Sequence, residues 1–187
     1  MNDPVVIADP LPYAASLQLR KVEEIDLVVI HCTELPDLAT AREYGEKILH
    51  PVSGTGNSGH FYLERSGKTH LWVPVERVAH HVRDYNERSI GIELVNNGRY
   101  PHWFDSRHQQ MDEPYGQPII KSLTALLLDL KLKLPGLMWI AGHEELDTSS
   151  VPSSDNPQIF VSRKRDPGPL FPWQDLLQVL DLTPLEI

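Results

Sequence analysis

The sequence has little sulfur and no long hydrophobic run. Cys32 is the only cysteine among 187 residues, which excludes an internal disulfide and a cysteine-rich metal site. We expect it to be a small buried residue rather than a nucleophile. No uninterrupted apolar stretch reaches the roughly 18 residues of a membrane-spanning helix. A glycine-flanked serine elbow is also missing, which argues against serine acyl transfer.

Positive charge is scarce as well. The chain has 17 Lys and Arg against 26 Asp and Glu, a formal net charge of -9. Because nucleic-acid binding needs a basic face, no nucleic-acid partner is expected. Strong adhesion to an anionic membrane is not expected either. Residues 1–10 show no basic segment followed by an apolar one, so we predict no secretory signal and a cytoplasmic location.

What remains is the composition of one globular domain, with 41% hydrophobic and 23% charged residues. A chain of this length can bury a sizeable core without disulfides or structural metal ions. Residues 1–24 are proline-rich and then polar, which predicts an N-terminal arm packed on the body. Residues 25–187 are predicted to form the domain itself.

Apolar patterning predicts the elements of that domain. Runs at 25–30, 89–95 and 137–141 are typical of strands, and 60–73 predicts a hairpin around a Ser-Gly turn. Helices are predicted at 37–50, 117–134 and 173–180, whereas 144–161 lacks periodicity and is predicted to be a loop. Strands alternating with helices, plus one hairpin, indicate an α/β fold, with a central mixed β-sheet flanked by helices.

Two predicted strands lead directly into a histidine, His31 after 25–30 and His143 after 137–141. Ligands of open α/β sheets gather beyond the strand ends. Asp166, which precedes a Pro-Gly-Pro turn, adds a carboxylate. Two imidazoles and one carboxylate are a donor set of catalytic zinc, which keeps a fourth position open. Taken singly, each histidine is better explained as a structural residue at a strand end; together the three predict a zinc site.

Two more charged residues are candidates for chemistry. Glu93 lies in the middle of a predicted strand, where a charge is costly unless it is paired or functional; the alternative is an edge-strand glutamate facing water. Lys164 stands two residues before Asp166, so in an extended segment both side chains point to the same side. Arg163 and Arg165 would point away and are predicted to be exposed to solvent.

Five segments carry a resemblance to a known family: VIHCT at 29–33, SGH at 58–60, SIGIEL at 89–94, GH at 142–143 and RKRDPGP at 163–169. Their order over residues 25–180 resembles the zinc-dependent N-acetylmuramoyl-L-alanine amidases. This is the AmpD-like group, which is related to phage T7-type lysozyme and to peptidoglycan recognition proteins. The resemblance implies a bacterial enzyme of cell wall recycling. It would cleave the amide between N-acetylmuramic acid and L-alanine in muropeptides or peptidoglycan fragments.

The resemblance also implies roles for particular residues. One Zn²⁺ per chain would be held by His31, His143 and Asp166. Glu93 would act as the general base and later as the acid for the leaving amine, and Lys164 would stabilise the oxyanion. An aspartate at the third ligand position, where the phage branch has cysteine, favours the AmpD-like group.

Residues 79–82 depart from the family pattern, because Ala-His-His-Val replaces the common Trp-His-Ala-Gly. His80 matches the histidine of that pattern and is predicted to line the wall of the substrate groove. The alternative is a packed histidine at a hairpin edge. The segment 144–161 is longer than the resemblance leads us to expect, which leaves a preference for a 1,6-anhydro sugar open.

The expected partner is therefore a muropeptide or peptidoglycan substrate, bound by a monomer. A different class of function is a non-catalytic muropeptide-binding module, like the recognition proteins that kept the groove but lost a ligand. The intact ligand set, together with Glu93 and Lys164, favours the enzyme. A third candidate, a zinc peptidase or deacetylase, differs in the bond that is broken.

Overall fold

A seven-stranded mixed sheet organises residues 4–185, the part of the chain that the computed structural model describes. Only the pair β3–β4 is antiparallel, and it is the predicted hairpin; the other neighbours are parallel. The predicted α/β architecture with a central mixed sheet is confirmed. Across the sheet the strands are β1 (Val6–Ala8), β4 (Thr69–Leu71), β3 (Phe61–Leu63), β5 (Ser89–Leu94), β2 (Leu27–Cys32), β6 (Trp139–Gly142) and β9 (Thr183–Pro184).

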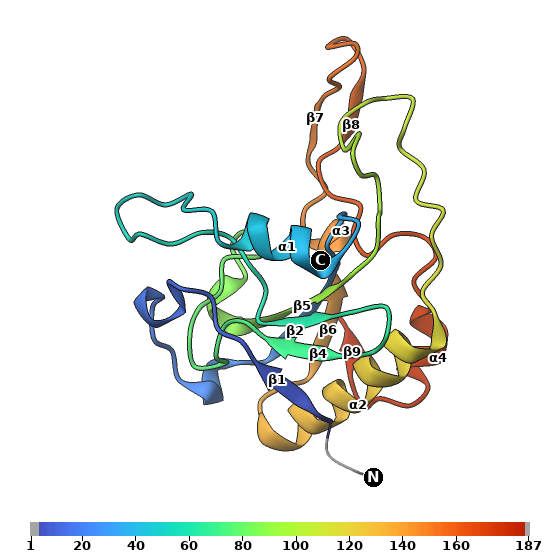
Figure 1. Ribbon diagram of the computed structural model, residues 1–187. Helices are drawn as coiled ribbons and strands as arrows, with labels where there is room; N and C mark the ends of the chain where they lie inside the picture. Colours follow the sequence, from blue (N-terminus) through green and yellow to red (C-terminus); the bar gives the residue numbers. More distant parts are fainter. Residues whose placement is uncertain (1–3, 186–187) are drawn as a thin grey trace.

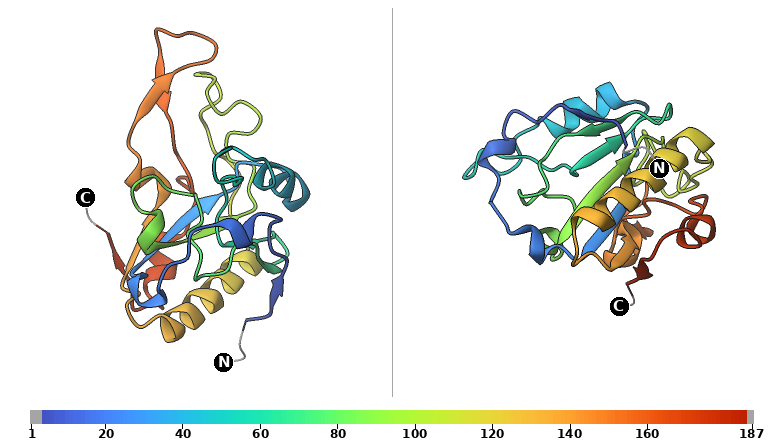
Figure 2. Two further views of the ribbon diagram at one scale, coloured as in Figure 1. Left: turned by 90° about the vertical axis from the view of Figure 1, so that its left-hand side faces the viewer. Right: turned by 90° about the horizontal axis from the view of Figure 1, so that it is seen from below.

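Helix α2 (Gln117–Lys133) lies across one face of this sheet (Figures 1 and 2). Its buried aliphatic side chains pack in the main core with Ile30 of β2 and Ile92 of β5. Since neighbouring residues of a strand point to opposite faces, His31 and Glu93 point to the other face. The sheet therefore has an apolar side under α2 and a side free to carry polar chemistry.

The other helices are shorter: α1 (Leu38–Gly45), α3 (His143–Leu146) and α4 (Trp173–Leu177). Single 3-10 turns occur at Ala14–Ser16, Val22–Glu24 and Asn86–Arg88. The Asp37 side chain caps α1 by accepting a hydrogen bond from Thr40 N at 2.7 Å. Instead of running on to residue 50, α1 gives way at Glu46 to an irregular loop. Within residues 4–185 we find no helix long and apolar enough to cross a bilayer.

Two segments predicted to be irregular contribute strands. β1 belongs to the predicted arm and pairs in parallel with β4. Residues 144–161, predicted to be a loop, contain most of α3 and of a hairpin made of β7 (Ser150–Pro152) and β8 (Phe160–Ser162). These strands are three residues long and largely exposed, so no apolar alternation marks them. The hairpin projects from the body beside the loop of residues 99–116 (Figure 1).

The boundary between arm and domain at residue 24 stays a prediction. Residues 1–3 and 186–187 of the two predicted regions lie outside the described residues. Leu11, Tyr13, Ala14 and Leu17 are buried in a second core cluster with Trp72. Cys32 is buried, as expected.

Candidate metal centre and active site

Strand register brings the candidate residues together. β2 lies between β5 and β6, with His31 opposite Glu93 and Ile30 opposite Gly142. Because paired residues of neighbouring strands point to the same face, His31 and Glu93 project side by side. His143 follows Gly142 as the first residue of α3. The ends of β2 and β5 and the start of α3, which lie far apart in sequence, therefore come together at the same end of the strands.

Local contacts hold the last two candidate ligands in place. The Glu145 carboxylate accepts a hydrogen bond from Gly142 N at 2.7 Å, which fixes the start of α3. Glu144 N donates to the backbone oxygen of Asp166 at 2.9 Å, tying the two segments to each other. A Cβ at Gly142 would lie 2.8 Å from Pro167 Cδ, so glycine is what allows this approach.

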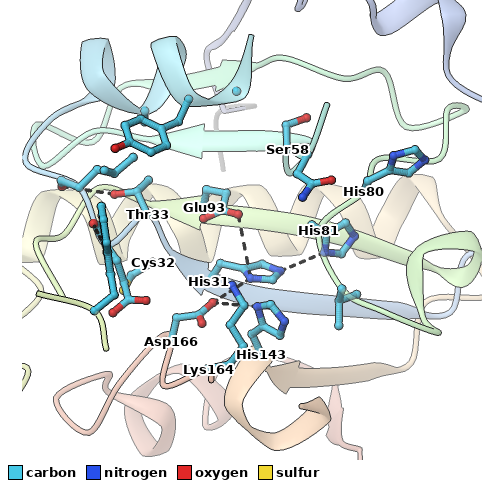
Figure 3. A pocket seen from close by; sticks show the side chains of 18 of the residues that line it. His31, Cys32, Thr33, Ser58, His80, His81, Glu93, His143, Lys164 and Asp166 are labelled. Carbon is cyan, nitrogen blue, oxygen red and sulfur yellow. Dashed lines mark hydrogen bonds and ion pairs between the residues drawn. The ribbon is translucent and has the colours of Figure 1, made fainter. Parts of the chain in front are cut away.

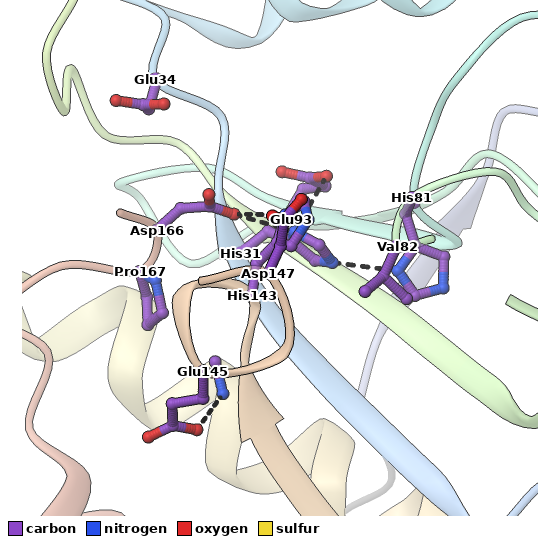
Figure 4. Close-up of polar contacts among 12 residues, drawn as sticks. His31, Glu34, His81, Val82, Glu93, His143, Glu145, Asp147, Asp166 and Pro167 are labelled. Atoms are coloured by element: carbon purple, nitrogen blue, oxygen red, sulfur yellow. Dashed lines mark hydrogen bonds and ion pairs between the residues drawn. The ribbon is translucent and has the colours of Figure 1, made fainter. Parts of the chain in front are cut away.

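The three predicted ligands converge on one point (Figures 3 and 4). Asp166 Oδ2 lies 2.9 Å from His31 Nδ1 and 3.1 Å from His143 Nδ1. All three residues are buried, with exposures of 2%, 2% and 3% for His31, His143 and Asp166. For comparison, ligand atoms about 2.0–2.1 Å from a tetrahedral zinc ion stand roughly 3.3 Å apart.

An unpartnered carboxylate oxygen supports a cation at this donor set. Within the described chain, Asp166 Oδ1 is buried without a hydrogen-bond partner. A buried polar atom left unpaired costs free energy, so such atoms call for an explanation. Two imidazole nitrogens and one carboxylate oxygen suit zinc, and a set of only three leaves a position open. The residues present therefore fit a catalytic zinc ion.

Electrostatics favour the metal-binding forms of His31 and Asp166. The pKa of His31 is lowered to about 4, chiefly by burial and also by His143 and Lys164, while the hydrogen bond and charge of Asp166 oppose the shift. Burial opposes ionisation of Asp166, but the charge of His143 and hydrogen bonds from both histidines hold its pKa well below its usual value. Neutral imidazole and ionised carboxylate are the ligand states of zinc.

Glu93 lies beside the ligand cluster, with its Oε1 4.0 Å from His31 Nδ1. Burial raises its pKa to about 8, the charge of Asp166 raises it too, and Lys164 opposes both. β5 lies between β3 and β2, so Glu93 is not the exposed edge-strand residue of the alternative. A Cβ at Gly59 would come within 2.9 Å of Glu93 Cγ, so this glycine makes room for the side chain. A carboxyl group that titrates near neutrality suits proton transfer.

One cavity of about 800 Å³ joins these groups. Its aromatic walls come from Tyr44, Trp103 and Phe104. The half-buried His80 lies at the opposite end from Asp166, its ring 4.8 Å from that of His50 (Figure 3). All six residues predicted from the sequence line the cavity: His31, His80, Glu93, His143, Lys164 and Asp166.

The prediction that both arginines beside Lys164 face solvent is wrong. Arg163 is half-buried, lines the cavity and forms an ion pair with Asp147. Arg165 is also half-buried and donates from Nη1 to the backbone oxygen of Gln109 at 2.6 Å. Side-chain alternation in an extended segment predicts the direction in which a side chain points. It does not predict which loop residues lie on that side.

Two features of the wall were missed. Arg99 and Glu34 form a buried two-pronged ion pair, with 2.7 Å from Nε to Oε1 and 2.9 Å from Nη2 to Oε2. Arg99 Nη1 also donates to the Ser162 backbone oxygen at 2.8 Å, which ties β8 to the pocket. The second feature is His81, whose Nδ1 lies 2.9 Å from His31 Nε2 (Figure 4). The His80-His81 pair was a signal for it, whereas nothing in the sequence pairs Arg99 with Glu34.

A second group with the same donor types lies on the loop 99–116. His102, Asp105 and His108 bring ligand atoms within 4.8 Å of one another, and both imidazoles are exposed. The Asp105 carboxylate is already paired, because Arg107 donates to Oδ1 from Nε at 3.1 Å and to Oδ2 from Nη2 at 2.9 Å. This cluster is satisfied without a metal ion.

The fold and the buried centre together define the chain as an α/β domain whose open pocket holds a His-His-Asp cluster that fits a metal ion. The family model described as N-acetylmuramoyl-L-alanine amidase matches residues 21–169. The chain belongs to that family, which confirms the resemblance of its dispersed motifs.

Relatives in sequence include the amidase AmiD of Escherichia coli (strain K12), 33% identical over 123 residues. That match covers 60% of this chain and 39% of AmiD. The endolysin of Escherichia phage T7 is 25% identical over 142 residues, 75% of this chain and 89% of the endolysin. Among solved structures, an AmpD derivative has a TM-score of 0.66 at 21% identity, covering 95% of this chain and 94% of AmpD. That last likeness shows the fold alone.

Proposed function

We propose that this chain is a zinc-dependent hydrolase that cleaves the amide between N-acetylmuramic acid and L-alanine in muropeptides or peptidoglycan fragments. The observation that carries the proposal is the convergence of His31, His143 and Asp166 beside the half-buried carboxyl group of Glu93. A solved complex of AmiD with the substrate anhydro-N-acetylmuramic acid-L-Ala-D-γ-Glu-L-Lys supports this class of substrate. That structure has a TM-score of 0.61 at 25% identity, and covers 83% of this chain and 57% of that chain.

The three ligands would hold one Zn²⁺, which when bound lowers the pKa of water and polarises a carbonyl group. Glu93 is placed to accept the proton of the attacking water. The same carboxyl group then returns the proton to the nitrogen as the carbon–nitrogen bond breaks, so that the peptide leaves as an amine. Its burial disfavours the ionised form and so favours that return.

Lys164 is proposed to stabilise the negative charge that develops on the carbonyl oxygen. Its side chain lies beside His143 and Asp166 at the pocket (Figure 3). A cation held where charge develops in the transition state lowers the barrier more than it strengthens substrate binding. His80 is proposed as a contact of the groove wall with the substrate.

The decisive experiment combines zinc analysis with a defined substrate. Protein purified without added metal is expected to contain one zinc per chain by elemental analysis. It should release the peptide from a MurNAc-peptide and lose this activity when a chelator is added. Tight binding without turnover would instead identify a non-catalytic muropeptide-binding module, and cleavage of another bond would indicate a peptidase or deacetylase. A cytoplasmic location and a monomeric state stay predictions.

A further inference from the structure

His81 contacts a candidate ligand from behind, on the side away from the metal position. Its Nδ1 lies 2.9 Å from His31 Nε2, while His31 Nδ1 faces Asp166. A neutral imidazole carries one hydrogen, so one nitrogen donates and the other accepts. The hydrogen bond that one ring nitrogen makes therefore decides whether the other nitrogen carries a hydrogen or a free lone pair.

The hydrogens of this chain of contacts can be assigned from its far end. The Ser89 hydroxyl lies 2.7 Å from the backbone oxygen of Tyr85, which can only accept, so Ser89 donates its hydrogen there. Ser89 Oγ also lies 3.2 Å from His81 Nε2. Because its one hydrogen is already donated, Ser89 Oγ can only accept a hydrogen bond there. His81 Nε2 must then be the donor, which leaves Nδ1 as the acceptor.

The same reasoning passes on to the ligand. Since His81 Nδ1 accepts, it favours a hydrogen on His31 Nε2, whereas the Asp166 carboxylate, 2.9 Å from His31 Nδ1, favours a hydrogen on Nδ1. A metal ion held by His31 and Asp166 would remove the second preference, so that His31 keeps its hydrogen on Nε2 and offers the Nδ1 lone pair. We propose that His81 is a positioning residue, which favours the tautomer of His31 whose Nδ1 can bind a metal ion. The proposal rests on the metal site of the proposed function, but it does not depend on which bond is cleaved.

Neighbouring residues hold the His81 ring and its backbone in place. Asn86 Oδ1 accepts from the backbone nitrogens of His81 and Val82 at 2.9 and 2.8 Å, which fixes the chain at this turn. A Cβ at Gly91 would lie 2.6 Å from the Cγ and Nδ1 atoms of the ring, so only glycine leaves this space.

The other imidazole ligand lacks such a partner. His143 Nε2 is buried and without a hydrogen bond within the described chain. His31 therefore has a partner that favours one ligand tautomer, whereas His143 has none within the described residues. This asymmetry gives the test its internal control, because a change at His81 is expected to alter His31 and to leave His143 as it was.

Long-range ¹H–¹⁵N correlation spectra of metal-free Asp166→Ala measure the tautomers directly, because this variant lacks the carboxylate that competes for the hydrogen. We expect His31 to carry its hydrogen on Nε2 in Asp166→Ala. When His81→Leu is added, Nε2 has no acceptor and this preference should be lost. A His31 protonated at Nδ1 in Asp166→Ala, or a tautomer unchanged by adding His81→Leu, would overturn the proposal.

Zinc affinity, measured by competition with a chromogenic chelator, is the second readout. We expect a loss of about 10–100-fold in His81→Leu, the usual cost of losing an outer partner of a metal-bound histidine. His81→Asn, whose Oδ1 can accept near the position of Nδ1, should recover most of that loss. Gly91→Ala, which displaces the ring without changing its chemistry, should resemble His81→Leu. The matched control is His70→Ala on β4, whose ring pairs with Glu64 away from the cavity and should leave affinity unchanged.

Failure of this inference is distinguishable from failure of the proposed function. Equal zinc affinity in His81→Leu and wild type, both folded by circular dichroism, would refute the role of His81 even if the amide is cleaved. If tautomer and affinity respond as expected but no MurNAc-peptide is hydrolysed, the role of His81 stands and the proposed substrate is wrong.

Discussion

Two regions of this molecule hold the same three donor groups in different surroundings. The pocket cluster of His31, His143 and Asp166 is buried and leaves polar atoms unpartnered. The loop cluster of His102, Asp105 and His108 is open to solvent at both imidazoles, and Arg107 hydrogen-bonds both oxygens of its carboxylate. Ligand types at a suitable spacing therefore do not define a metal centre. Burial, together with a carboxylate oxygen that has no hydrogen-bond partner among the described residues, makes the difference.

The largest effect is expected from removing a pocket ligand. His143→Ala should lose zinc and lower turnover by more than about 10⁴-fold, because loss of the cation also leaves Glu93 without an activated water. Elemental analysis and release of peptide from a MurNAc-peptide measure the two losses. If His143→Ala kept its full zinc content and a change at His102 removed the zinc, the metal would be bound at the loop cluster and not in the pocket.

Removing the base should separate chemistry from metal binding. Glu93→Ala and Glu93→Gln are expected to keep one zinc per chain and to lose about 10²–10⁴-fold in kcat, the range of general acid–base catalysis. Since Glu93 is not a ligand, its zinc affinity should stay close to that of the wild type. Rates equal to the wild type in either variant would show that another group takes the proton.

Burial of Glu93 should also make the metal-free protein sensitive to pH. The pKa of Glu93 is raised from 4.5 to about 8 on folding, so between these pH values the folded state binds more protons than the unfolded state. The free energy of unfolding therefore falls as pH rises from 4.5 through 8. We expect a loss on the order of a few kcal/mol, which Glu93→Gln removes and bound zinc reduces, because a nearby cation favours the carboxylate. Denaturant unfolding with and without zinc at pH 5 and 8 tests this. Parallel pH profiles for the metal-free wild type and Glu93→Gln would contradict the assignment.

The smallest effect is expected at the loop cluster. His102→Ala and His108→Ala should each leave zinc content at one per chain and change stability by less than about 0.5 kcal/mol, as exposed substitutions usually do. Equilibrium dialysis with zinc and thermal unfolding measure both quantities. A second zinc equivalent that disappears in these variants would show that pairing with Arg107 does not keep a cation away.

Local sequence patterns predicted much of the fold. Helix α2 was predicted within one residue because leucines recur along one side of it. Strand β5 lies within the predicted run 89–95, whereas β2 ends at Cys32 and β6 at Gly142, just beyond the runs 25–30 and 137–141. The hairpin β7–β8 was missed, because its strands are short and exposed and pairing alone defines them. β1 was missed for the same reason, since a strand of three residues at a sheet edge has no pattern of its own.

The sequence alone predicted that His31, His143 and Asp166 meet. Apolar runs that end in histidine and a carboxylate before a rigid turn are local features, and the carboxyl ends of parallel strands lie at the same end of a sheet. Only the tertiary structure decided what surrounds these three residues. The contact of His81 with His31 and the pairing of Arg99 with Glu34 join residues 50 and 65 positions apart, and the ion pair of Arg163 with Asp147 joins the two ends of the β7–β8 hairpin. Such contacts depend on how loops pack over the sheet, which no local propensity specifies.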